Sequence, residues 1–172
     1  MLPDAPSICR LHLDFMKWAD DRMFTLVRGL DQEMLNRNEG VSFGSLAGTV
    51  QHIYRAERVW YRRVHGEPSV QIGAVESPSI EELAQLWPRL HEEWRRWALE
   101  LDSNGWYQSI LSKNAQGVES RLPHWQIVLH LVNHGTYHRG QVVSLVRQAG
   151  VEPVGTDLIA YYRALAAKAT PA

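Results

Sequence analysis

The sequence predicts an all-α protein built as a four-helix bundle, and three observations support this fold class. Hydrophobic residues recur at intervals of three to five over four long segments, which is the spacing of amphipathic helices. The 172 residues are 45% hydrophobic and 22% charged, a composition typical of one globular domain, here expected to span residues 1–172. Four long amphipathic helices in a single domain favour a bundle.

The first two predicted helices have recognisable starts. One helix is expected over residues 5–30, with Asp4 as its N-cap. A second is expected over residues 45–65, where Ser45 caps the start and Gly66 ends the helix. Both caps belong to the residue types that accept a hydrogen bond from a free backbone N–H of the first turn.

A long connection separates the second helix from the third. Residues 66–78 are rich in glycine, proline and serine, which indicates a loop. Ser79 and Glu82 then form an S-x-x-E capping box, which predicts a sharp start for the third helix.

The last third of the chain combines a predicted hairpin with two helices. Polar and apolar residues alternate over residues 105–122, which predicts a short β-hairpin with its turn at 114–117. Pro123 is expected to be the first residue of a fourth long helix that ends at Gly150. A short final helix is expected over residues 156–167.

Composition and charge exclude several protein classes. The net charge of -1 gives no general attraction to nucleic acid or to acidic lipid. The single cysteine, Cys9, cannot form an internal disulfide, and no apolar run approaches the ~20 residues that a membrane span needs. The first residues lack the pattern of a secretory signal. We therefore expect a cytoplasmic protein that binds neither nucleic acid nor membranes.

Three histidines in the fourth predicted helix form a regular pattern. His130, His134 and His138 are spaced four residues apart, so their side chains project from one side of the helix. Two imidazoles at this spacing can chelate one divalent ion. Zinc needs three or four ligands. A third ligand must come from another helix, for which His52 is the best candidate and His12 a weaker one.

Spacing alone leaves two questions about these histidines open. It does not decide whether His134 pairs with the histidine before it or the one after it. It also does not decide between a metal site and a hydrogen-bonded polar stripe in the core, since buried imidazoles need partners in either case. The remaining histidines, His65, His91 and His124, are interpreted as surface or helix-capping residues.

Three segments resemble the DinB/YfiT-like family. The segment 129–141 contains the pattern H-x-x-N-H-x-x-x-H-R-G-Q, which resembles the C-terminal signature of that family. The segment 42–53, followed by Glu57 and Trp60, resembles its second-helix signature, and residues 17–20 resemble the W-A-N/D segment of its first helix. The resemblance covers most of the chain.

This resemblance implies a fold and a metal site. The fold is a four-helix bundle with up-down-down-up connections, for which the loop at 66–78 supplies the long crossover. The metal ligands carried over by motif are His52, His134 and His138. Three imidazoles suit zinc, nickel, iron or copper, and of these we expect zinc or nickel. His130 then lines the pocket beside the ligands or has a structural role.

The resemblance also implies an activity. Three protein ligands leave a coordination position open, which is the pattern of catalytic zinc sites. The implied enzyme activates a low-molecular-weight thiol such as bacillithiol, mycothiol or glutathione for transfer to a small electrophilic substrate, or activates water. Members of the family are often dimers, so a homodimer is expected.

The sequence identifies no catalytic residue and leaves other functions open. Glu57 and Tyr137 lie near the ligands in sequence. For each of them a role as general base and a purely structural role both remain open. Arg139 has two interpretations: it orients a carboxylate or a thiol cofactor, or it belongs to a surface ion pair. The alternatives are a non-catalytic metal-binding or stress-response protein and a metal-free helical interaction module.

Overall fold

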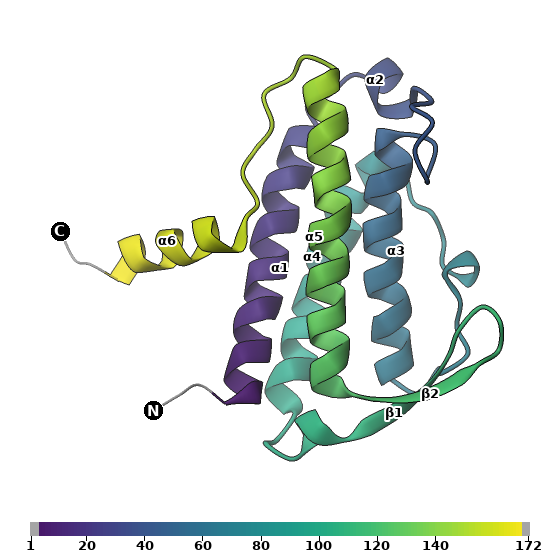
Figure 1. Ribbon diagram of the computed structural model, residues 1–172, viewed down its shortest axis with the longest axis vertical. Helices are drawn as coiled ribbons and strands as arrows, with labels where there is room; N and C mark the ends of the chain where they lie inside the picture. The colour runs from purple at the N-terminus through teal and green to yellow at the C-terminus, as the bar shows by residue number, and fades with distance from the viewer. Residues whose placement is uncertain (1–3, 170–172) are drawn as a thin grey trace.

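The computed structural model describes residues 4–169 and has the predicted four-helix-bundle architecture (Figure 1). The long helices are α1 (Ala5–Val27), α3 (Leu46–Val64), α4 (Ile80–Glu100) and α5 (His124–Gln148). In Figure 1, α1 and α5 run upward while α3 and α4 run downward, so the connections follow the predicted up-down-down-up order. The crossover between α3 and α4 climbs back along the outside of α3.

The helix starts are capped as the sequence predicts. The side chain of Asp4 accepts a hydrogen bond from the backbone N–H three residues later at 2.9 Å, and Ser45 does the same at 3.1 Å. Ser79 and Glu82 form the complete capping box, with distances of 3.2 and 2.8 Å between side chain and backbone. These local bonds fix where each helix begins.

Within residues 4–169, four short helical elements accompany the long helices. They are α2 (Gln32–Asn36), η1 (Ile72–Ala74), η2 (Gly105–Tyr107) and α6 (Leu158–Ala169). Of these, α6 corresponds to the predicted final helix, whereas α2 was not predicted. At only five residues, α2 is too short to show a helical hydrophobic period, although Asp31 caps it.

The predicted hairpin is present but starts later in the chain than expected. Strand β1 (Ser109–Lys113) pairs antiparallel with β2 (Glu119–Pro123), and Ser109 lies opposite Pro123. Trp106 lies in η2 and is fully buried, so its alternation with neighbouring residues reflects a buried turn rather than a strand. Pro123 ends β2 and occupies the N-cap position of α5, so the helix begins at His124, one residue later than predicted.

The core lies between the four long helices and is rich in aromatic side chains. Helix α5 packs against both α1 and α3, and α4 packs against the same two helices. The largest fully buried side chains include Trp87, Trp94 and Trp106. Burying side chains of this size removes a large apolar area from water, which stabilises the bundle.

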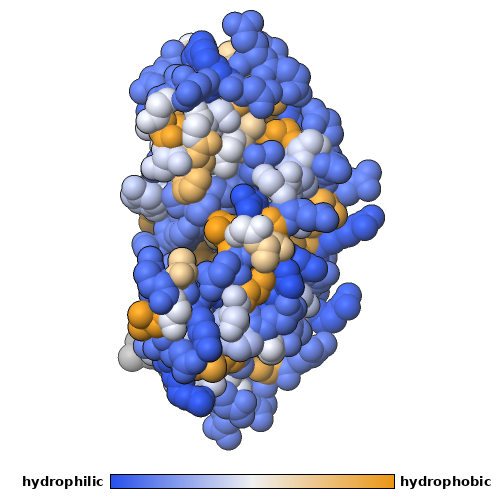
Figure 2. Space-filling model, turned by 90° about the vertical axis from the view of Figure 1, so that its right-hand side faces the viewer, coloured by the Kyte–Doolittle hydropathy of each residue, from blue (hydrophilic) through white to orange (hydrophobic). Residues whose placement is uncertain are grey.

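The surface on the side of α3 and the crossover is mainly polar (Figure 2). On the face that carries α3 and the crossover, hydrophobic atoms occur in small patches separated by hydrophilic side chains (Figure 2). Among the residues that the structure describes, no helix is both long and apolar enough to cross a membrane.

Candidate metal centre

The three histidines that the family resemblance selects meet at one point between α3 and α5. His52 projects from α3, and His134 and His138 project from α5. One potential ligand atom from each ring lies within 4.8 Å of the other two. Nε2 of His52 and Nε2 of His134 are 3.1 Å apart. The two helices therefore bring His52 together with two side chains that lie more than 80 positions further along the chain.

The spacing of these nitrogens suits a shared metal ion. Two imidazole nitrogens that each lie ~2.0–2.1 Å from a tetrahedral zinc ion are about 3.3 Å from one another. The observed 3.1 Å between His52 and His134 is close to that separation. The same pair of nitrogens can also share one proton in a hydrogen bond, so the donor set and its geometry fit a metal ion without requiring one.

His138 is oriented by a residue of its own helix. Its Nδ1 lies 2.8 Å from Oε1 of Gln141, and an amide oxygen accepts but does not donate. Nδ1 of His138 therefore carries the proton, and Nε2 keeps the lone pair that a metal ligand needs. Gln141 was not singled out from the sequence, although it is the last residue of the recognised H-x-x-x-H-R-G-Q string.

Burial keeps two of these imidazoles neutral. It lowers the pKa of His52 from 6.5 to about 4, with smaller contributions from His138 and Arg55. Burial likewise lowers the pKa of His134 to about 3, assisted by the neighbouring His138 and His52. Both rings are neutral at pH 7, which is the form that binds metals.

The turn before α3 positions an aromatic ring over His52. The ring of Phe43 stacks on the His52 ring, with centroids 3.8 Å apart and planes inclined by 15°. Gly48 makes this close approach possible, because a Cβ at that position would lie 2.1 Å from the carbonyl oxygen of Phe43. Because Gly48 has no side chain, there is room for the turn that precedes α3.

Two other candidate histidines lie outside the three-histidine cluster. His130 is beside it, with its ring 5.8 Å from the ring of His134 and 5.3 Å from that of Trp60. Burial lowers the pKa of His130. His12 bonds through Nδ1 to the backbone oxygen of Ile8 at 2.8 Å, within its own helix.

The interpretation of the remaining histidines as surface or capping residues is correct for one of them. His65 is exposed and caps the end of α3. His91 and His124 are instead buried, with exposed fractions of 4% and 7%. His124 bonds to the carbonyl oxygen of Gly105 at 2.8 Å. Partners on distant segments make such burial possible, and helix periodicity alone does not reveal them.

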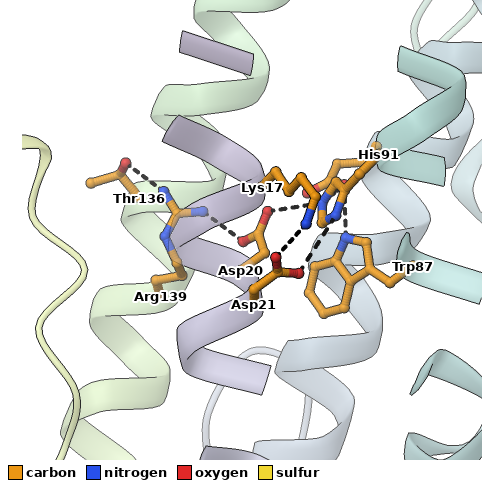
Figure 3. Close-up of polar contacts among 8 residues, drawn as sticks. Lys17, Asp20, Asp21, Trp87, His91, Thr136 and Arg139 are labelled. Atoms are coloured by element: carbon orange, nitrogen blue, oxygen red, sulfur yellow. Dashed lines mark hydrogen bonds and ion pairs between the residues drawn. The ribbon is translucent and has the colours of Figure 1, made fainter. Parts of the chain in front are cut away.

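Arg139 is a buried interhelical residue. It is 1% exposed, and its Nη1 donates to Oδ1 of Asp20 on α1 at 2.7 Å (Figure 3). Its Nη2 donates to Oγ1 of Thr136 at 2.9 Å. The alternative of a surface ion pair is therefore wrong, because the side chain points into the bundle rather than outward.

The other two residues near the ligands in sequence differ in their placement. Glu57 is 2% exposed, accepts a hydrogen bond from Trp87, and does not belong to the three-histidine cluster. Tyr137 is 66% exposed, and its ring centroid is 4.9 Å from that of His138. Of the two, only Tyr137 lies beside a proposed ligand.

Comparisons with known proteins agree on one family. The model of the DinB family matches residues 8–169. Protein DinB of Bacillus subtilis (strain 168) is 27% identical over 153 residues, which cover 84% of this chain and 87% of that protein. The crystal structure of a DinB-like protein from Bacillus cereus ATCC 10987 superposes with a TM-score of 0.62 at 21% identity. That match covers 84% of this chain and 94% of that one.

Proposed function

Because this chain belongs to the DinB family, we propose that it is a metal-dependent enzyme in which His52, His134 and His138 hold one divalent ion. The observation that carries the proposal is the convergence of these three rings, with 3.1 Å between Nε2 of His52 and Nε2 of His134. The hydrogen bond from His138 to Gln141 supports it, because a ligating imidazole is commonly held through its second nitrogen.

A ligand set of three imidazoles suits zinc or nickel. Both ions accept nitrogen ligands of intermediate softness, and three protein ligands leave room for a further one. When bound, the ion supplies Lewis acidity that lowers the pKa of a thiol or of water at the remaining position. The protein's own contribution is to hold the three rings in place and, by burial, to keep His52 and His134 neutral.

The proposed substrates are a low-molecular-weight thiol and a small electrophile. His52 and His134 are only partly buried, so a small molecule has access to them from outside. Tyr137, which lies beside His138 and is largely exposed, is placed to contact such a molecule. We include water as an alternative nucleophile, since the same open position would accept it.

The first test is the metal content of untagged protein purified without chelators. We expect wild-type protein to carry one more equivalent of zinc or nickel than a His134→Ala variant. A His12→Ala variant is the matched control, because His12 is also a helical histidine but bonds only to its own helix. Equal metal content in wild type and His134→Ala would overturn the ligand assignment.

A second test separates an enzyme from a non-catalytic metal-binding protein. Cobalt(II) is substituted into the wild-type site, and its visible absorption is recorded while a small thiol is added. A thiol-dependent change that is absent in His134→Ala supports the open, thiol-activating site and justifies a screen for thiol transfer. An unchanged spectrum would favour the alternative of a structural or storage site.

A further inference from the structure

A second cluster of potential ligands lies inside the bundle. Asp20 from α1, Glu57 from α3 and His91 from α4 converge there, with exposed fractions of 1%, 2% and 4%. One nitrogen or oxygen atom of each side chain lies within 4.8 Å of the other two. Three different long helices therefore contribute one polar side chain each to a single point in the core.

Several polar atoms of this cluster have no hydrogen-bond partner among the residues that the structure describes. They are Oδ2 of Asp20, Oε1 of Glu57 and both ring nitrogens of His91. Nε2 of His91 lies 3.4 Å from Oδ2 of Asp20 and 3.6 Å from Oε2 of Glu57, too far for good hydrogen bonds. Unpartnered polar atoms at this depth are costly, so their gathering at one point calls for an explanation.

The remaining atoms of the two carboxylates are already held. Oδ1 of Asp20 accepts from Arg139 at 2.7 Å, and Oε2 of Glu57 accepts from Nε1 of Trp87 at 2.9 Å. Figure 3 shows Arg139 and His91 approaching Asp20 from opposite sides. Outer partners of this kind orient ligating oxygens in known metal sites, and they leave one oxygen of each carboxylate free.

His91 has a comparable outer neighbour. Its Nδ1 lies 4.0 Å from Oδ1 of Asp21, on the opposite side of the ring from Nε2, which is the nitrogen nearest to Asp20 and Glu57. A carboxylate near the second nitrogen is the common arrangement around a ligating histidine. Each side chain of the cluster thus has at least one unpartnered polar atom, and each has a polar neighbour on another of its atoms.

A bound cation would also balance the charge of this cluster when both of its acids are ionised. Two carboxylates face one guanidinium, that of Arg139, so the cluster lacks a positive charge when both acids are ionised. Burial and the nearby Asp20 raise the pKa of Glu57 well above its usual range. Burial alone would also raise the pKa of Asp20, but Arg139 and His91 lower it overall. One proton would engage at most two of the unpartnered atoms, whereas a metal ion engages three.

We propose that Asp20, Glu57 and His91 form a second metal site, distinct from the three-histidine cluster, that takes a divalent transition-metal ion. Two carboxylate oxygens and one imidazole nitrogen form a mixed ligand set that suits manganese or zinc. The proposal does not depend on the function of the three-histidine cluster, because the two sets of ligands share no residue.

The test counts metal equivalents in variants that isolate each site. Chelator-stripped protein is incubated with manganese or zinc in a low concentration of urea, to allow entry into the core, and is then desalted and analysed. We expect two equivalents of zinc in wild type, one in His134→Ala and none in His134→Ala combined with Glu57→Gln. Glu57→Gln keeps an oxygen to accept from Trp87 but removes the carboxylate charge.

X-ray absorption spectroscopy of zinc-loaded His134→Ala tests the second site while Asp20, Glu57 and His91 remain unmutated. We expect the zinc in this variant to be coordinated mainly by oxygen atoms and by a single imidazole. Zinc held by the three-histidine cluster would instead be coordinated by several imidazoles. Absence of bound ion in folded His134→Ala, or an imidazole-rich shell there, would overturn this second site. One equivalent in wild type that is lost in His134→Ala contradicts the second site and leaves the three-histidine proposal standing.

Discussion

Arg139 and Asp20 form a buried ion pair that joins α5 to α1 across 119 positions of the chain. Arg139 follows the proposed ligand His138 directly, so the pair anchors the segment of α5 that carries the candidate metal centre. A Cβ at Gly135 would lie 2.7 Å from the guanidinium of Arg139, so this glycine leaves the space that the buried side chain occupies.

Removing one member of this pair should destabilise the bundle strongly. We expect Asp20→Ala to lower the free energy of unfolding by ~3–5 kcal/mol, because it leaves the Arg139 guanidinium buried without its counter-charge. Urea denaturation measures the change. Replacing both residues, as in Asp20→Leu with Arg139→Met, should recover much of the loss. A double variant as unstable as the sum of the single ones would contradict a pairwise explanation.

Gln141 should control metal affinity without being a ligand. We expect Gln141→Leu to weaken zinc binding by about 10- to 100-fold, because His138 loses the acceptor that fixes its ring and its protonated nitrogen. Competition with a chromophoric chelator measures the affinity. Gln141→Glu keeps an acceptor at the same place and should bind at least as tightly as wild type. Equal affinities for all three proteins would rule out this orienting role.

Acidification should destabilise the metal-free protein through the histidine cluster. The pKa values of His52 and His134 are about 4 and about 3 in the folded chain, against 6.5 for an ordinary histidine. As the pH falls from about 6.5 towards 4, the unfolded chain takes up protons that the folded chain does not, so the free energy of unfolding falls.

The matched comparison for this pH effect is His134→Gln. That variant has one fewer histidine with a lowered pKa, so its stability should fall less steeply over the same pH range. Urea denaturation of both metal-free proteins from pH 7 to pH 4 provides the measurement. Carboxylates titrate in both proteins alike, so parallel curves would show that His134 does not contribute.

Gly48 and Gly140 should respond in opposite directions to the same substitution. We expect Gly48→Ala to destabilise the protein by ~1–3 kcal/mol, because the added Cβ collides with the carbonyl oxygen of Phe43. Gly140→Ala, on an exposed helical position with open space around it, should stabilise by roughly 0.5–1 kcal/mol. Thermal unfolding measures both changes in stability. A Gly48→Ala variant as stable as wild type would mean that the turn before α3 rearranges at little energetic cost.

The long helices were predictable because their signals are local. The caps at Asp4, Ser45 and Ser79 and the three-to-five spacing of apolar residues all lie within a few positions of one another. The start of β1 was misplaced because Trp106 alternates with its neighbours as a strand residue would, yet it is buried in a turn under the bundle.

The candidate metal centre was predictable only in part. Four-residue spacing placed His134 between two equivalent neighbours, and the resemblance to a family was needed to choose His138. His91 was misinterpreted because its neighbours in the core, Asp20 and Glu57, belong to other helices and lie far away in sequence. A single helix pattern contains no information about such partners.

The up-down-down-up connection also affects when the candidate metal centre can form. Helix α5 packs against both α1 and α3, so its contacts with α1 join segments more than 100 residues apart. Such long-range contacts slow folding relative to bundles with only neighbouring contacts. On the ribosome, α1, α3 and α4 emerge well before His134 and His138 do. The three-histidine cluster is therefore completed late, and a chain interrupted before α5 would expose the surfaces of α1 and α3 that α5 covers.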